Sequence, residues 1–462
     1  MTHLYDPIAA ISTPPGKGGV SVIRMSGEGA LAIAEQVFFP RSKKKLSEYP
    51  ARMQVYGDLV RDGRHIDDCL ATYFTSGSSY TGEQTVEISC HGGILVTRCV
   101  LEALFSKGAR EAGKGEFTKR ALINGKLTLT EAEAIGDVLD AKSEEQLRLL
   151  SSDSRARLAG RISDIKKSLT EILGSLFARI DYPDEDLGDF DNDELIRLTS
   201  GALCEVRKLI SSYRLGHAIN EGIRTVICGR PNVGKSTIYN LILGEDAAIV
   251  TDISGTTRDV LERTVPLGRV LLHLADTAGI RESSDVVEAI GIKRSKSRVQ
   301  SAELIVAVFD ISEGLCDEDK ELLNIIKTSG AAKIAVLNKS DRQARLTEAD
   351  FGGGFDAYIK GSAQSSDDAL LDELKIAVEG LFDAERISAD SDAIVFSARQ
   401  NAALLRAEEF LSLASNALAA GVPQDAVASD VERALGALGE LDGREVNEEV
   451  VANIFSRFCV GK

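Results

Sequence analysis

The sequence lacks several features that would restrict where the protein works and what it can bind. No stretch is long, apolar and uncharged enough for a membrane helix, and the N-terminus has no signal-peptide pattern. The seven cysteines are scattered and include no CxxC pair, which argues against disulfides and zinc sites. The five histidines are dispersed as well, as ordinary core or surface residues are. We therefore expect a cytoplasmic protein with reduced thiols and no membrane contact.

Basic residues are fewer than acidic ones, 54 Lys and Arg against 71 Asp and Glu. The formal net charge of the 462 residues is -17, so the chain as a whole repels nucleic acid. Contact with RNA then needs a local basic patch or a basic partner, and no DNA partner is expected. A small basic cluster at residues 41–45 is typical of a solvated loop. Hydrophobic content of 44% and charged content of 27% are typical of a soluble protein, and the length predicts two to three domains.

The clearest motif present is a phosphate-binding loop at residues 229–237, GRPNVGKST. An apolar run at 225–228 precedes it and predicts a buried strand, and a helical apolar face follows it. This order directs backbone N–H groups and the positive end of a helix at an anion. Lys235 is expected to reach the β- and γ-phosphates, and the Ser236 hydroxyl is expected to hold magnesium.

Three further motifs predict that the nucleotide is GTP. Asp276 opens the motif DTAG at a strand end, where its carboxylate can hold the metal through water. Asp341 closes the motif NKSD and can accept two hydrogen bonds from the guanine edge, which adenine does not offer. The pair at 362–363 follows a strand-like run and can touch the base through its backbone. The predicted GTP-binding residues are Asn232, Val233, Gly234, Lys235, Ser236, Thr237, Thr251, Asp252, Ile253, Ser254, Gly255, Thr256, Thr257, Asp276, Thr277, Ala278, Gly279, Asn338, Lys339, Ser340, Asp341, Ser362 and Ala363.

GTP hydrolysis is expected to need a group other than the usual glutamine to position the attacking water, and a further positive charge. Many GTPases orient the attacking water with a glutamine directly after the motif that corresponds to DTAG. Here that residue is Ile280. No arginine finger within the chain is obvious, although Arg258 and Arg281 lie near the motifs. Asn232 and the segment 251–257 offer neutral oxygens, which suit a monovalent cation, so potassium is a reasonable hypothesis for the missing charge.

The remaining patterns predict a multidomain chain with an α+β region, a helical domain and an inserted α/β P-loop G domain. Asp62-Gly63 separates two β-like runs and predicts a hairpin, and alternation at 85–89 places Val86 and Ile88 opposite Glu87. Heptad-like helices on both sides of the GTP motifs favour one helical domain interrupted by the G domain; two separate bundles are the alternative. The predicted boundaries are 1–118 (α+β), 119–221 (helical, first part), 222–384 (G domain) and 385–462 (helical, second part).

Several motifs together resemble those of the MnmE (TrmE) family of tRNA uridine-modifying GTPases, over essentially the whole chain. They are the phosphate loop with Asn232, Gly255-Thr-Thr-Arg-Asp259, Thr13-Pro-Pro-Gly-Lys-Gly-Gly19, Tyr80-Thr-Gly-Glu83, Cys90-His-Gly-Gly93, Gly115-Glu-Phe117 and the C-terminal Cys459-Val-Gly-Lys462. Valine replaces the commoner isoleucine in the C-terminal motif, and the segment 342–355 is irregular and glycine-rich; neither departure touches another motif.

The resemblance implies an N-terminal folate-binding domain that forms a homodimer, and G domains that meet in a potassium- and GTP-dependent way to activate hydrolysis. It also implies an FAD-dependent partner, MnmG (GidA), in a heterotetramer, with FAD on the partner and not on this chain. The pair would add an aminomethyl-type group to C5 of the wobble uridine (position 34) of certain tRNAs. A tetrahydrofolate derivative, 5-formyl or methylene, would supply the carbon.

The resemblance further assigns roles to single residues. Ser236 and Thr257 match magnesium ligands, and four positions match potassium ligands: Asn232, Thr251, Ile253 and Thr256. Lys235, Glu288 and Cys459 match catalytic positions, Glu288 acting on the nucleophilic water through a bridging water. The folate-contacting positions are Arg24, Glu87, Lys126 and Lys462.

Two other functions fit parts of the sequence. A ribosome-assembly GTPase of the Era or EngA type has similar G motifs, but it needs a basic RNA-binding domain after the G domain, where this chain is acidic and helical. A folate enzyme with a regulatory GTP site differs from the main hypothesis only in its activity on tRNA with the partner.

Overall fold

The computed structural model describes residues 6–181, 192–244, 262–275, 299–363, 369–382, 392–442, 455, 458, 460 and 461. It divides the chain into two compact units, Met1–Leu139 with Gly439–Lys462, and Asp140–Leu438. Among the described residues, no helix combines the length and the apolar character needed to cross a bilayer.

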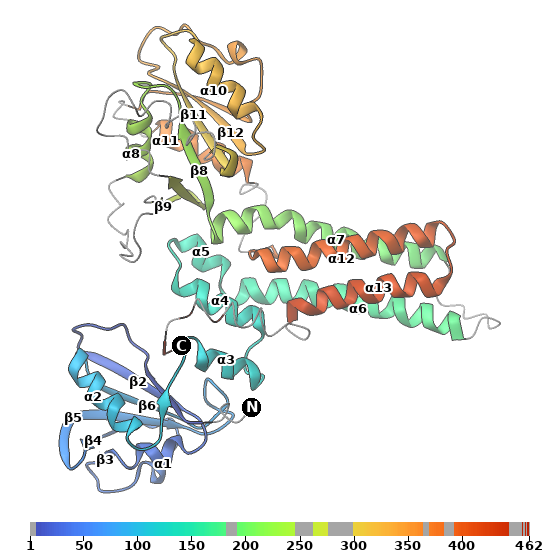
Figure 1. Cartoon of the computed structure of the whole chain (residues 1–462). Helices are drawn as coiled ribbons and strands as arrows, with labels where there is room; N and C mark the ends of the chain where they lie inside the picture. The colour runs from blue at the N-terminus through green and yellow to red at the C-terminus, as the bar shows by residue number, and fades with distance from the viewer. Residues whose placement is uncertain are drawn as a thin grey trace. The chain divides into compact units, whose positions relative to one another are not determined.

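The first unit is built on a seven-stranded sheet in the order β3-β4-β5-β6-β2-β1-β7 (Figure 1). Neighbouring strands are antiparallel except β1 and β7. Helices α1 and α2 share one apolar core with the sheet, in which Ile33 and Leu104 meet Ile23 and Ile88. The elements are β1 (Ile8–Ile11), β2 (Val20–Ser26), α1 (Ala30–Ala34), β3 (Phe38–Pro40), η1 (Leu46–Glu48), β4 (Val55–Arg61), β5 (Arg64–Phe74), β6 (Thr85–His91), α2 (Ile94–Phe105) and β7 (Arg110–Glu111).

Two local predictions for this unit are confirmed. Asp62 and Gly63 have φ of 49° and 76° and form the turn of the β4–β5 hairpin, where both central residues need a positive φ. Val86 and Ile88 are fully buried, whereas Glu87 lies on the other face of β6 and is half-buried. The alternation therefore predicted which face of the strand the carboxylate occupies.

The C-terminal residues belong to this same unit. They pack beside α3 (Glu116–Ile123), α4 (Leu129–Leu139) and η5 (Glu440–Asp442), with Phe455 and Phe458 in a core with Ala132. Val460 forms a β-bridge with Lys114, and Ser12 Oγ donates to the Gly461 carbonyl at 3.0 Å. A Cβ on Gly461 would lie 2.2 Å from the Ile11 carbonyl oxygen, so only glycine fits there. No local pattern in the sequence indicates this docking.

The second unit contains a helical bundle in which α6, α7, α12 and α13 lie side by side (Figure 1). The predicted apolar seam of α6 is buried from Ile162 to Leu176, as is that of α12 from Leu404 to Leu418. In α13 the seam differs slightly, because Ala434 is buried and Leu435 only half-buried. The bundle elements are α5 (Glu144–Leu149), α6 (Ser152–Asp181), α7 (Asn192–Asn220), α12 (Ala398–Ala419) and α13 (Gln424–Gly439).

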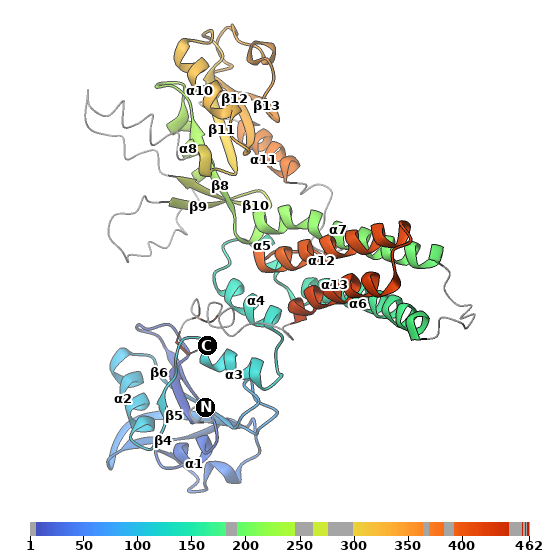
Figure 2. The same ribbon diagram turned by 45° about the vertical axis from the view of Figure 1, so that its right-hand side comes forward.

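The G domain is a six-stranded sheet in the order β13-β12-β11-β8-β10-β9, parallel except for the β9–β10 pair. Figures 1 and 2 show α10 and α11 on opposite sides of β11 and β12, all seven residues of β11 being buried. The elements are β8 (Ile223–Cys228), α8 (Lys235–Leu243), β9 (Glu262–Leu267), β10 (Val270–Ala275), β11 (Leu304–Asp310), α10 (Asp317–Lys327), β12 (Ala332–Asn338), η4 (Glu348–Phe351), β13 (Ala357–Lys360) and α11 (Ala369–Leu381).

The G domain is inserted in the helical domain. Helix α7 leads into β8 through only Glu221 and Gly222, and α12, which follows the G domain in the sequence, packs against α7. The Val395 N–H donates to Ser212 Oγ of α7 at 3.0 Å, which fixes the returning chain. The predicted fold class is therefore confirmed and the alternative of two separate bundles is wrong. The domain boundaries given above stay predictions.

Candidate GTP site and folate site

The phosphate loop lies between the end of β8 and the start of α8. Gly234 has a φ of 103°, and a Cβ there would lie 2.1 Å from Asn338 Nδ2. A Cβ on Gly229, at φ 148°, would lie 2.4 Å from the Val308 carbonyl oxygen. Both glycines are therefore required by close approach as well as by backbone conformation. The loop opens onto the amino end of α8, whose unpaired N–H groups favour an anion.

Lys235 is the first residue of α8 and turns back over the loop. Its Nζ donates to the Arg230 carbonyl at 2.7 Å. Burial lowers the pKa of Lys235 below its ordinary value. A bound phosphate would favour the charged ammonium and could replace the carbonyl as its acceptor, as expected for the lysine of this motif.

Asn338 ties the phosphate loop to the loop that is expected to meet the base. Its side chain, almost fully buried, donates from Nδ2 to the Val233 carbonyl at 2.7 Å. Its Oδ1 accepts from the Ala363 N–H at 2.9 Å. The Ser340 N–H donates to the Gly361 carbonyl at 3.1 Å, so the two base-recognition segments are joined twice. Motifs far apart in the sequence thus form one rigid site.

Asp341 is exposed at the end of this arrangement. A hydrogen bond from the Ser362 side chain holds the pKa of Asp341 below its ordinary value. The carboxylate is therefore ionised at neutral pH, which makes it an acceptor for the two N–H donors of guanine.

Part of the predicted GTP site lies outside the described residues. It comprises Thr251, Asp252, Ile253, Ser254, Gly255, Thr256, Thr257, Asp276, Thr277, Ala278, Gly279 and Glu288. The structure brings together the other predicted GTP residues, from the phosphate loop and from the two base-recognition segments.

The predicted folate residues of the first unit lie around the segment 77–83. Arg24 pairs with Glu87 across β2 and β6, with Arg24 Nε 2.9 Å from Glu87 Oε1. The Arg24 guanidinium lies 5.4 Å from the centre of the Tyr80 ring and 5.8 Å from that of Phe117. Lys126 is exposed, and its Nζ donates to the Gly77 carbonyl at 2.8 Å. Two further predicted residues, Cys459 and Lys462, lie outside the described residues, although Val460 and Gly461 between them are docked on this unit.

A buried ion pair that sequence reasoning missed supports this segment. The Arg120 side chain, 3% exposed, donates to Glu83 Oε2 at 2.9 Å and to the Asp6 carbonyl at 2.8 Å. Ser26 Oγ donates to the same Glu83 oxygen at 2.9 Å. Glu83 is the last residue of the Tyr80–Glu83 motif, and that position was the only feature of the sequence that could have pointed to the ion pair. Removing one partner would leave a buried charge, so the pair fixes the segment that carries Tyr80.

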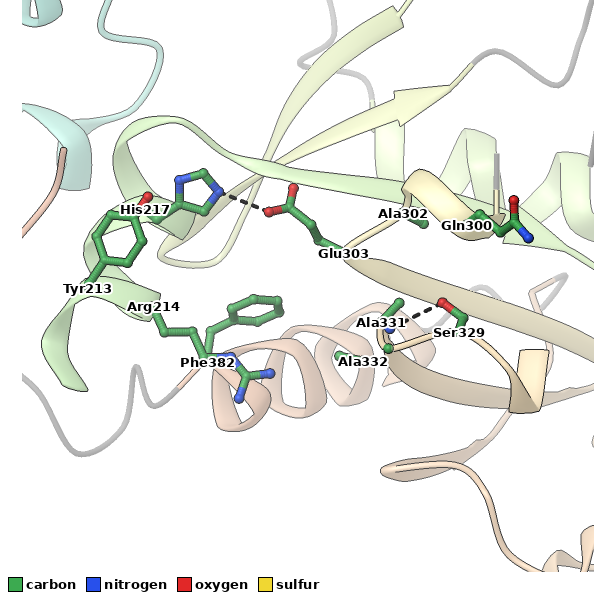
Figure 3. A pocket seen from close by; sticks show the side chains of 11 residues that line it. Tyr213, Arg214, His217, Gln300, Ala302, Glu303, Ser329, Ala331, Ala332 and Phe382 are labelled. Atoms are coloured by element: carbon green, nitrogen blue, oxygen red, sulfur yellow. Dashed lines mark hydrogen bonds and ion pairs between the residues drawn. The ribbon is translucent and has the colours of Figure 1, made fainter. Parts of the chain in front are cut away.

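Two other features are not part of either site. A cavity of about 390 Å³, lined by His217, Glu303, Ser329 and Phe382 among others, lies at the amino ends of β11 and β12 (Figure 3). The nucleotide motifs follow the carboxyl ends of the G-domain strands, so this cavity is not the GTP site. Among the described residues, Asp58, His65 and Asp68 lie within metal-ligand reach of one another, but the Arg41 guanidinium lies 2.7 Å from Asp58 and 3.0 Å from Asp68. We interpret that cluster as an ion-pair network.

Fold and site define the class: a P-loop GTPase whose G domain interrupts a helical domain. Comparison with known proteins agrees. The family model described as MnmE helical domain matches residues 129–459, and that described as GTP-binding protein TrmE N-terminus matches residues 7–126.

Curated relatives match over the full length. The tRNA modification GTPase MnmE of Clostridioides difficile is 39% identical, with 99% of each chain covered, and that of Natranaerobius thermophilus is 38% identical, again over 99% of each. Among solved structures, Aquifex aeolicus Era is 25% identical over 41% of this chain and 67% of that chain, with a TM-score of 0.26. The chain belongs to the MnmE family.

Proposed function

We propose that the chain is a GTP hydrolase that acts in tRNA modification together with the FAD-dependent partner MnmG (GidA). The pair modifies C5 of the wobble uridine of certain tRNAs to an aminomethyl-type group, with a tetrahydrofolate derivative, 5-formyl or methylene, as carbon donor. The observation that carries the proposal is the joined GTP site, in which Asn338 links the phosphate loop to the base loop, in a chain that is 39% identical to a named member of the family.

Two of the described residues, Ser236 and Asn232, offer oxygens that suit magnesium and a monovalent cation. Ser236 lies in the first turn of α8, where its hydroxyl accompanies the phosphates, and Thr257 would complete the magnesium ligands. Asn232 offers the neutral side-chain oxygen that suits potassium, and the proposed potassium site adds Thr251, Ile253 and Thr256. Bound magnesium would neutralise charge on the β- and γ-phosphate oxygens.

The chain's own residues then orient and stabilise the reacting groups. Lys235 is placed over the phosphate loop and neutralises the phosphate oxygens. Glu288 orients the attacking water through a second water, in place of the absent glutamine. Asp276 would hold the magnesium ion, through a water molecule, when the ion is bound.

In the first unit, the fit to a folate rests on charge and stacking. The Glu87 carboxylate accepts hydrogen bonds from pterin amine groups, and Arg24, Lys126 and Lys462 suit the glutamate carboxylates. The Tyr80 ring, whose centre lies 5.4 Å from the Arg24 guanidinium, offers a flat apolar surface for stacking. We propose that Cys459 is needed for the tRNA reaction.

Homodimerisation through the first unit is supported by an exposed apolar group. Val20 is 63% exposed, Ile94 is 70% exposed and Leu95 is 74% exposed. Val20 pairs with His91, the last residue of β6, and α2 begins three residues later at Ile94, so the three residues lie at one end of the sheet. Clustered exposed apolar side chains of this kind mark protein interfaces. MnmG joins the dimer in a heterotetramer.

The proposal is tested in a strain that carries Lys235→Ala as its only copy. We expect wobble-uridine modification to be lost while the protein level is kept, because the ammonium that contacts the phosphates is gone. Mass spectrometry of tRNA nucleosides measures the outcome. Intact modification would rule out a GTP-driven role and favour a folate enzyme with a regulatory GTP site; loss of ribosome assembly with intact modification would favour an Era-type switch.

A further inference from the structure

Asp310 is a buried carboxylate beside the GTP site to which sequence reasoning assigned no role. It is the last residue of β11, and its side chain is only 2% exposed. Its Oδ1 accepts from the Ser312 N–H at 3.0 Å and from Ser312 Oγ at 2.6 Å. Burial favours the neutral acid, but the hydrogen bonds from Lys339 and Ser312 outweigh it and hold the pKa of Asp310 below its ordinary value. The group is therefore a fixed negative charge.

That charge holds the lysine of the NKSD motif. Lys339 Nζ lies 2.6 Å from Asp310 Oδ2 and donates to the Asn232 carbonyl in the phosphate loop at 2.8 Å. The ammonium thus bridges the base loop, the phosphate loop and the end of β11.

The two residues joined by this contact share an uncommon backbone conformation. Lys339 and Asn232 each have a φ of 64°, in the left-handed region that lysine rarely adopts and asparagine adopts more often. Such conformations persist only where surrounding contacts hold them. Without the Asp310 carboxylate, the Lys339 ammonium would lose one of its two acceptors. Its side chain could then adopt other positions, and the contact with the Asn232 carbonyl would no longer be fixed.

We propose that Asp310 is a positioning residue for guanine nucleotide binding: it fixes Lys339 between the NKSD loop and Asn232, and so holds the base loop and the phosphate loop at one spacing. The inference rests on the proposed GTP site and adds a residue that touches neither base nor phosphate. It does not depend on tRNA, folate or dimerisation.

The test uses the purified full-length chain and a fluorescent GDP. We expect Asp310→Asn to weaken GDP binding about 10- to 100-fold, since a charge-assisted hydrogen bond is removed. Asp317→Asn, an equally conservative change at a fully exposed residue of α10, should bind GDP as the unaltered chain does. Unchanged binding by Asp310→Asn would overturn the proposal.

A double-mutant comparison separates positioning from general support of the fold. If Asp310 acts through Lys339, then Asp310→Asn should add less than twofold to the loss caused by Lys339→Met. A full, additive loss in the Lys339→Met background would show that Asp310 acts elsewhere and would overturn the proposal.

Ser312→Ala gives an independent reading if Asp310→Asn does not fold. It removes one donor that orients the carboxylate, so GDP binding should weaken about 2- to 10-fold. Unchanged binding by Ser312→Ala, with no folded Asp310→Asn protein, would count against positioning. None of these readouts involves tRNA modification, so failure here leaves the proposed function standing, and failure of that function leaves these affinities unaffected.

Discussion

Replacing Asp341 by asparagine should change which base the site accepts. Asp341 is exposed and ionised, and it follows β12 at the end of the rigid link made by Asn338. Guanine presents two N–H donors to this carboxylate. Xanthine presents a carbonyl oxygen in place of the exocyclic amine, and an asparagine amide can donate to that oxygen.

The magnitude follows from the two bonds lost. Each charge-assisted hydrogen bond is worth about 10- to 100-fold in affinity, so Asp341→Asn should weaken GDP binding roughly 10²- to 10⁴-fold. Xanthosine diphosphate should bind the variant at least about tenfold better than it binds the unaltered chain. Because Asp341 is exposed, the protein should remain folded.

Competition of GDP and xanthosine diphosphate for a fluorescent nucleotide measures both effects. Asp356→Asn is the matched control, because Asp356 is another exposed acid of the same domain whose contact is with the Lys333 N–H. An unchanged ratio of the two affinities in Asp341→Asn would refute base recognition by this carboxylate.

Two further predictions concern the phosphate loop and the contact of His217, near the end of α7, with Glu221 and Glu303. Gly234→Ala should abolish measurable GTP binding without unfolding the chain, because the added Cβ would lie 2.1 Å from Asn338 Nδ2. Gly314→Ala is the control and should bind GTP normally, since the space around Gly314 is open. Equal binding by the two variants would contradict the loop geometry. His217 lies between Glu221 and Glu303, whose hydrogen bonds raise its pKa from 6.5 to about 9. The stability that this pairing gives to the folded chain is therefore complete below pH 6.5 and is lost as the pH rises through about 9. Nuclear magnetic resonance titration of its ring should show a midpoint near 9; a midpoint near 6.5 would contradict the pairing.

The parts of the fold that the sequence predicted depend on local patterns. The phosphate loop was recognisable because its glycines meet backbone and side-chain atoms at fixed positions, and the strands before Asn338 and Asp276 were recognisable as short apolar runs. The faces of β6 and the seams of α6 and α12 followed from periods of two and of three to four residues.

The parts that could not be predicted depend on contacts between distant segments. Nothing near Gly461 indicates that Ser12, 449 positions earlier, holds the C-terminal segment. Asp310 ends an apolar strand, as Asn338 does, but it belongs to no recognised motif, and its contact with Lys339 depends on strand order. His217 has an ordinary helical position in the sequence, and its partner Glu303 lies 86 positions later, just before β11.

We propose that GTP hydrolysis is activated when the G domains of two copies meet and a monovalent cation completes each site. The most direct test measures the hydrolysis rate per chain against chain concentration, in sodium, potassium and rubidium salts, with the mass of the G-domain assembly followed by light scattering. We predict a rate that rises with concentration in potassium, stays low in sodium and falls when Asn232 is replaced by alanine. A rate per chain that is the same at all concentrations and in every salt would contradict the account.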